Sequence, residues 1–190
     1  NIRFEKSFTS DLTQLMKLAG CIAVSGGLEV ASDRLLKKIK KGVSIEQVSK
    51  VNNHFTNSGI MVHAYLMYGF PTQTKQETID SLEVVRQMFE NNIIQSAYWH
   101  QFSMTAHSPV GLNPSEFSVE RVDDIIGEFA NNDLIHQDPS GADHVQFSAG
   151  LKKSLYNYMH GIGFDFNLQE WFDFKIPKVS IQKNLISKYI

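Results

Sequence analysis

Small and polar residues gather where two apolar runs of the sequence end. At the first end Ser25 and Glu29 stand on either side of two glycines, and at the second Gly69 and Pro71 lead into a row of hydroxyl and amide groups. An ionised carboxylate such as Glu29 accepts strong hydrogen bonds, and glycine lets the backbone approach a ligand closely. These residue types favour a ligand-binding site, while an exposed loop acid and an ordinary turn would account for the same residues without a ligand.

Three histidines supply further groups that could act as metal ligands or as acids and bases. His63 stands inside an apolar run, where a hydrogen-bonded core histidine is the commoner case. His100 and His107 fall near the end of another run and are candidate substrate contacts. The sequence has no zinc-protease, P-loop, nucleophile-elbow or dinucleotide-binding motif, so it assigns no catalytic residue and no metal ligand.

Two charges near the N-terminus, Arg3 and Glu5, alternate with Ile2 and Phe4, which places both on one face of a short expected strand. If that face lines an interior, the charges must pair or bind something, and both become candidate substrate contacts. If the face is an exposed edge, they are simply solvated.

The elements that would position these residues alternate over the first hundred residues. Nearly unbroken apolar runs predict buried strands at residues 21–27, 60–70 and 93–104. Helical spacing and capping signals predict helices at residues 9–20, 32–42, 44–59 and 74–92. This alternation indicates right-handed βαβ units on a parallel sheet, in which ligands gather at the carboxyl ends of the strands.

The alternation stops after about residue 105. Residues 118–132 have the spacing of an amphipathic helix, and the last forty residues are dense in aromatic side chains. We therefore predict two parts, with residues 111–190 as a helical, aromatic-rich extension that packs on residues 1–110.

Composition limits the class of protein. The 190 residues are 42% hydrophobic and 20% charged with a net charge of −2, which is typical of a globular protein and gives no general attraction to nucleic acid. No apolar run reaches the roughly 20 residues that a membrane span needs, and the first residues do not resemble a signal peptide. We expect a cytoplasmic protein, and the missing initiator Met suggests a piece of a longer chain.

Two stretches resemble the second half of a radical S-adenosylmethionine (SAM) enzyme barrel. One is Gly27-Leu28-Glu29, followed after a helix by Lys41-Gly42, and the other is the segment Gly69-Phe70-Pro71-Thr72-Gln73-Thr74. The resemblance covers about residues 1–110. The stretch SAYWHQFSMTAHSPVGLNP is also similar to members carried beside cobalamin-binding domains.

The resemblance implies a fold and a set of cofactor contacts. The fold would be a partial, half TIM-like barrel of parallel βα units, with residues 2–6 as its third strand. Glu29 would bind the ribose hydroxyls or the methionine amino group of SAM, and Lys41 its carboxylate. Gly69 and Pro71 would shape the turn against adenine, and Ser25 would face the pocket. Lys41 is equally explained as one of several lysines on a solvated helix, at an end that favours cations.

The implied chemistry is reductive cleavage of SAM by a 4Fe-4S cluster, which gives a 5′-deoxyadenosyl radical that abstracts hydrogen. In this family three cysteines hold the cluster, and iron–sulfur clusters require such thiolates. The chain has one cysteine, Cys21, which we interpret as a buried structural thiol. His100 and His107 would contact the unknown substrate or, as a further cofactor, cobalamin.

The expected function is therefore that of a fragment of a radical SAM enzyme. It would complete the SAM pocket and contribute substrate contacts, while an N-terminal half of the parent would bring the cluster ligands. The alternative is a non-catalytic βα module that binds a small molecule or a protein. A half barrel exposes strand edges, so we also expect self-association through them.

Overall fold

The computed structural model describes residues 1–122 and 132–190. Its α-helices are α1 (Ser10–Leu18), α2 (Asp33–Lys38), α3 (Ile45–Asn57), α4 (Lys75–Glu90), α5 (Pro109–Leu112) and α6 (Ser148–Met159). Its strands are β1 (Ala23–Glu29), β2 (Met61–Tyr68), β3 (Ser96–Gln101), β4 (Met104–Thr105), β5 (Glu120–Arg121), β6 (Asp133–Leu134) and β7 (His136–Gln137). Short 3-10 turns lie at Pro114–Phe117, Val145–Phe147, Leu168–Trp171 and Ile186–Lys188.

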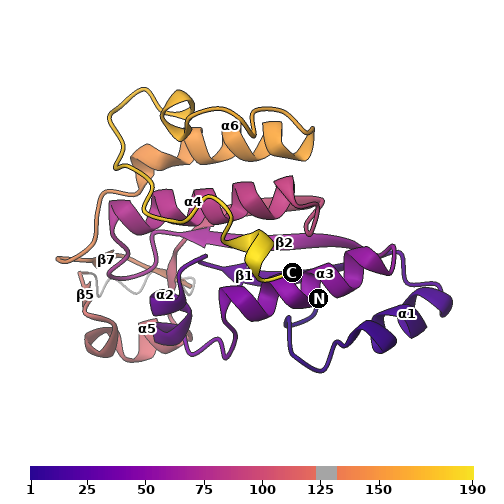
Figure 1. The fold of residues 1–190 in the computed structure, drawn as a ribbon. Coiled ribbons are helices and arrows are strands. Elements are labelled where there is room, and N and C mark those ends of the chain that lie inside the picture. Colours follow the sequence, from indigo (N-terminus) through magenta and orange to yellow (C-terminus); the bar gives the residue numbers. More distant parts are fainter. Residues whose placement is uncertain (123–131) are drawn as a thin grey trace.

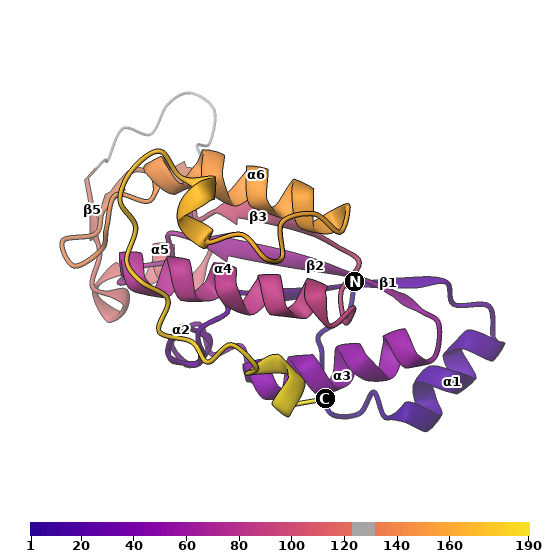
Figure 2. The same ribbon diagram turned by 45° about the horizontal axis from the view of Figure 1, so that its top comes forward.

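The main sheet has three parallel strands in the order β1-β2-β3 (all three labelled in Figure 2; β1 and β2 also in Figure 1). The mixed α/β class and the parallel βα units predicted from the sequence are confirmed, and the described strands form an open sheet instead of a closed barrel. The strand predicted at residues 2–6 is wrong, because only Ile2 pairs with the sheet, through a parallel bridge to Gly26. The next residues turn away, with the Glu5 amide donating to the Arg3 carbonyl at 2.7 Å.

One face of this sheet is covered and the other is not. Helices α3, α4 and α6 all lie on the same side, where α3 packs on β2, α6 packs on β3 and α4 packs on α6 (Figure 2). The alternate residues of the strands that face them are buried: Leu28, Val62, Ala64, Leu66, Tyr68, Ala97 and Trp99. Neighbouring residues in a strand point to opposite faces, so the residues between these lie on the opposite side, which we call the open face.

Local signals explain the helices that line the covered face. Thr74 accepts a hydrogen bond from the Glu77 amide while the Glu77 carboxylate accepts one from the Thr74 amide, so the predicted capping box of α4 is confirmed. The predicted cap of α3 also forms, with Ser44 accepting from the Gln47 amide. These caps fix where each helix starts relative to the strand before it.

A second, smaller core lies over the carboxyl ends of the strands. Phe70, from the turn after β2, contacts the rings of Phe102 and Phe117 with centroid distances of 5.2 and 6.0 Å. The segments that supply this core pair as short antiparallel ribbons, β4 with β6 and β5 with β7. These residues therefore cover part of the carboxyl-terminal edge of the sheet.

The C-terminal part is less helical than predicted. Helix α6 packs on β3 and α4, and the residues after it form 3-10 turns and extended segments that run back over α4 (Figure 2). Most of the amphipathic helix predicted at residues 118–132 lies outside the described residues, and its residues 120–121 form β5. Cys21, predicted as a buried thiol, is half-buried and precedes β1. No helix in the described ranges is both long and apolar enough to cross a membrane.

Candidate functional site

The strongest candidate site lies on the open face, at the end of β1. The Lys41 ammonium donates to the Glu29 carboxylate at 2.6 Å, and the two side chains are 19% and 24% exposed. Glu29 has a φ of +61°, a left-handed conformation that non-glycine residues seldom adopt, and the pairing with β2 shifts register at this point. Strained backbone of this kind gathers at functional sites, so the pair combines strain with partly buried opposite charges.

Gly27 makes room for this ion pair. A Cβ atom at position 27 would collide with the Glu29 carboxylate and would lie 2.8 Å from the Lys41 ammonium. The carboxylate of Glu29 therefore folds back over the strand, into space that a side chain would fill. Gly27 pairs with Tyr65, and Tyr65 pairs with Tyr98, so a single row crosses the open face from the ion pair to β3.

Aromatic rings from β2 and β3 continue this row. The ring of Tyr65 lies 4.9 Å from that of His63 and 6.1 Å from that of His100, and the rings of Tyr98 and His100 are 4.5 Å apart. His63 Nδ1 is 2.8 Å from the Ser96 hydroxyl. Burial, reinforced by the charge of His100, lowers the pKa of His63, which favours a neutral imidazole.

The other predicted site residues on this side lie nearer the sheet edge. Ser25 is half-buried and its hydroxyl donates to the Asn1 side chain. Arg3 and Glu5 are exposed and lie 4.0 Å from each other, which agrees with the exposed-edge alternative. His107 is exposed in the turn before α5, outside the rows of the sheet. The functional roles of all four stay predictions.

The turn after β2 is held by protein contacts. Gly69 has a φ of +79°, and a Cβ there would lie 3.3 Å from the Cβ of His144. His144 is buried, with Nε2 3.0 Å from the Gln73 carbonyl and Nδ1 3.4 Å from the Thr78 hydroxyl. Pro71 is buried in the same turn. The positive φ and the close approach of His144 therefore account for the glycine, whether or not an adenine also approaches.

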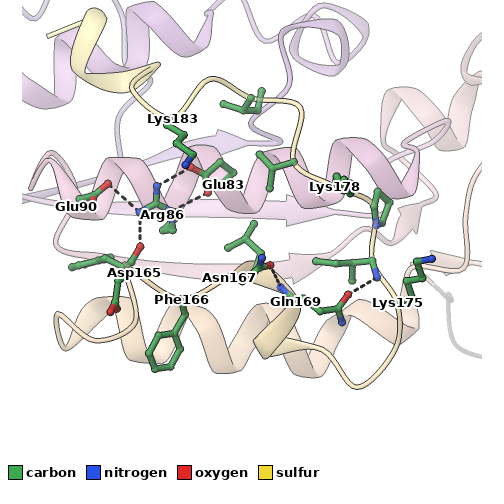
Figure 3. Close-up of a pocket in the computed structure, with 16 residues that line it drawn as sticks. Glu83, Arg86, Glu90, Asp165, Phe166, Asn167, Gln169, Lys175, Lys178 and Lys183 are labelled. Carbon is green, nitrogen blue, oxygen red and sulfur yellow. Dashed lines mark hydrogen bonds and ion pairs between the residues drawn. The ribbon is translucent and has the colours of Figure 1, made fainter.

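A separate groove of about 840 Å³ lies on the covered side, between α4 and the C-terminal segment (Figure 3). Arg86 holds its wall together by donating to the Glu83 carboxylate at 2.8 and 2.9 Å, to Glu90 at 3.0 Å and to the Phe164 carbonyl at 2.8 Å. Lys175, Lys178 and Lys183 are exposed around it. Because Arg86 is committed to these partners, we interpret it as structural.

The side chains of the candidate site limit which ligands could bind there. The Glu29–Lys41 pair offers one acceptor and one donor of opposite charge, which fits a zwitterion. A 4Fe-4S cluster does not fit, because the chain has a single cysteine, and residues 1–122 and 132–190 contain no group of three or more His, Cys, Asp or Glu suited to a metal.

Sequence reasoning missed Tyr65 and Tyr98. The signal was present, because these tyrosines alternate along their strands with buried residues and share their spacing with His63 and His100. An apolar run interpreted as buried on both faces conceals that alternation.

No family model and no curated protein matches the sequence. Among solved structures, the fold is similar to that of TsrM, a radical S-adenosylmethionine methyltransferase from Kitasatospora setae with cobalamin and a 4Fe-4S cluster bound. The similarity covers 80% of this chain and 34% of that chain, with 14% sequence identity and a TM-score of 0.54. At this identity the likeness concerns the fold alone, and the chain spans about a third of that protein.

Proposed function

We propose that the chain is the C-terminal part of a radical SAM-type half barrel and forms one wall of its SAM site. The observation that carries the proposal is the strained, partly buried Glu29–Lys41 pair above Gly27. The shared fold with part of a radical SAM methyltransferase supports it. The 190 residues would bind and orient the cofactor, while the cluster ligands come from another segment.

The ion pair suits the amino-acid end of SAM. The Glu29 carboxylate would accept from the ligand's ammonium group, and the Lys41 ammonium would donate to the ligand's carboxylate. Before binding, the two side chains neutralise each other at 2.6 Å, so the site carries no unpaired charge while it is empty of ligand. Binding exchanges one ion pair for two. In the parent protein, with the cluster held by another segment, bound SAM would be the source of the 5′-deoxyadenosyl radical.

The test is binding of SAM to the 190-residue chain, measured by calorimetry or, for weak affinity, by NMR titration. We expect Glu29→Gln and Lys41→Met each to weaken binding about tenfold, the effect of one lost charge-assisted contact of roughly 1.4 kcal/mol. Glu46→Gln is the matched control, since Glu46 forms an exposed ion pair with Lys50 at the same 2.6 Å. Equal affinity in Glu29→Gln and the parent chain would contradict the proposal.

A second candidate is the non-catalytic binding module, which the groove beside α4 favours. Its volume of about 840 Å³ falls within the range of small-molecule sites, and its lysines would suit an anionic ligand. If the folded chain fails to bind SAM at millimolar concentration, this candidate takes precedence.

A further inference from the structure

Four rings, linked in a chain of three contacts, occupy the open face beside the ion pair. They come from neighbouring positions of two paired strands: His63, Tyr65, Tyr98 and His100. Tyr98 is 50% exposed and His100 is also exposed, while His63 and Tyr65 are half-buried. We call these four residues the ring cluster.

The polar atoms of the ring cluster are largely unused. Within the described parts of the chain, no hydrogen bond engages the hydroxyls of Tyr65 and Tyr98 or the imidazole of His100. His63 uses one ring nitrogen on Ser96 and keeps the other. The cluster therefore offers aromatic surface together with several free donors and acceptors.

The nature of the face limits what could cover it. Parallel sheets are normally covered on both sides, and a covering layer of helices packs against Val, Ile and Leu. The ring-cluster rows carry mainly serine, glycine, histidine and tyrosine instead: Ser25, Gly27, His63, Tyr65, Ser96, Tyr98 and His100, with the apolar Met67 opposite His100. Such a surface suits a polar, flat molecule better than an apolar protein layer.

We propose that the ring cluster binds a flat heteroaromatic ring, held by stacking on Tyr98 and by hydrogen bonds to the free tyrosine and histidine atoms. Stacking of a base on an aromatic side chain is a strong and sequence-tolerant contact. The proposal rests on the proposed function, because the same open face would hold the ring and the zwitterion. Strands lie about 4.8 Å apart, so the ring would bind one to two strands from the Glu29–Lys41 pair.

The test is an NMR titration of the chain with adenosine, with ribose as the non-aromatic control. We expect adenosine, and not ribose, to shift the imidazole C–H signals of His63 and His100, identified from His63→Gln and His100→Gln. Tyr98→Ala should weaken adenosine binding about tenfold. Tyr156→Ala is the matched control, because Tyr156 contacts His160 at the same ring distance of 4.5 Å on α6 and is likewise exposed; it should leave binding unchanged.

A second titration distinguishes this inference from the proposed function. Methionine has the ammonium and carboxylate groups of SAM but no ring, so its binding, and the loss of that binding in Glu29→Gln, tests the ion pair alone. If methionine binds and adenosine shifts neither histidine, the ring-cluster proposal is overturned while the SAM-site proposal stands. If adenosine shifts the histidines and methionine does not bind, the SAM-site proposal is overturned while the ring-cluster proposal stands. Equal losses in Tyr98→Ala and Tyr156→Ala would also overturn the ring cluster. Competition with SAM shows which molecule carries the bound ring. If SAM displaces adenosine, the ring is the adenine of SAM. If both bind at the same time, the ring belongs to a second molecule.

Discussion

The two faces of the same three strands differ in residue type and in burial. On the covered face, Leu66 and Trp99 are at most 2% exposed under α3, α4 and α6. One residue earlier in each strand, on the open face, the hydroxyls of Tyr65 and Tyr98 have no hydrogen-bond partner among residues 1–122 and 132–190, and both side chains keep part of their surface in solvent. Because strand side chains alternate, a single register fixes both faces. Apolar burial is concentrated on one face, and polar aromatic side chains are concentrated on the other.

The largest expected difference between the two faces is the loss of stability when neighbouring residues of β3 are truncated. We expect Trp99→Ala to lower the free energy of unfolding by about 3–5 kcal/mol, since it empties a large site in the core. Tyr98→Ala should cost under about 1 kcal/mol because half of that side chain is exposed. Denaturant unfolding followed by circular dichroism measures both. Similar losses in the two variants would mean that the open face is packed in solution.

A smaller effect concerns the C-terminal segment on the covered side. Arg86 and Glu83 are nearly buried, and hydrogen bonds and the charge of Glu83 raise the pKa of Arg86, so the guanidinium stays charged. Arg86→Met would leave Glu83 buried without its partner and release the Phe164 carbonyl. We expect a loss of about 3 kcal/mol in unfolding free energy.

The control for Arg86→Met is Lys50→Met, which removes an ion pair that is about half exposed and that solvent screens. We expect no clear change in the unfolding midpoint for that variant. If the two substitutions cost the same, Arg86 does not hold the C-terminal segment, and the groove beside α4 has another support.

Local patterns account for what the sequence predicted well. The capping box at Thr74 and the apolar run before it place β2 and α4 within a few residues, because those signals lie within one segment. The ribbons β4–β6 and β5–β7 were missed, since they join residues far apart in the chain through only two residues per strand. No local pattern encodes such a pairing.

The sequence was enough to name residues of the candidate site, but not to predict how they contact one another. Glu29 and Lys41 were named from their motif, yet their mutual ion pair follows from the left-handed turn at Glu29 and the absent side chain of Gly27. Backbone conformation of this sort is not encoded by residue spacing. Similarly, the packing of His144 on Gly69 depends on a contact between residues 75 positions apart, which sequence alone does not reveal.

The smallest predicted effect is the pH dependence of stability, to which a histidine on each side of the sheet contributes. Burial lowers the pKa of His144 below its ordinary value of 6.5. The hydrogen bond to the Gln73 carbonyl and the charges of Asp138 and Asp143 act in the opposite direction. In the unfolded chain this histidine takes up a proton near pH 6.5, while in the folded chain it stays neutral to lower pH. Stability should therefore fall as the pH drops below about 6.5, by at most about 1.4 kcal/mol per pH unit for this one group.

Unfolding curves of the parent chain, His144→Gln and His63→Gln at pH 8 and at pH 5.5 measure this dependence. His63 on the open face also has a pKa lowered by burial, but it is more exposed than His144. We expect His144→Gln to remove more of the pH dependence than His63→Gln does. An equal effect of the two substitutions would mean that the open face excludes water as well as the covered face, which only a covering partner or ligand could achieve.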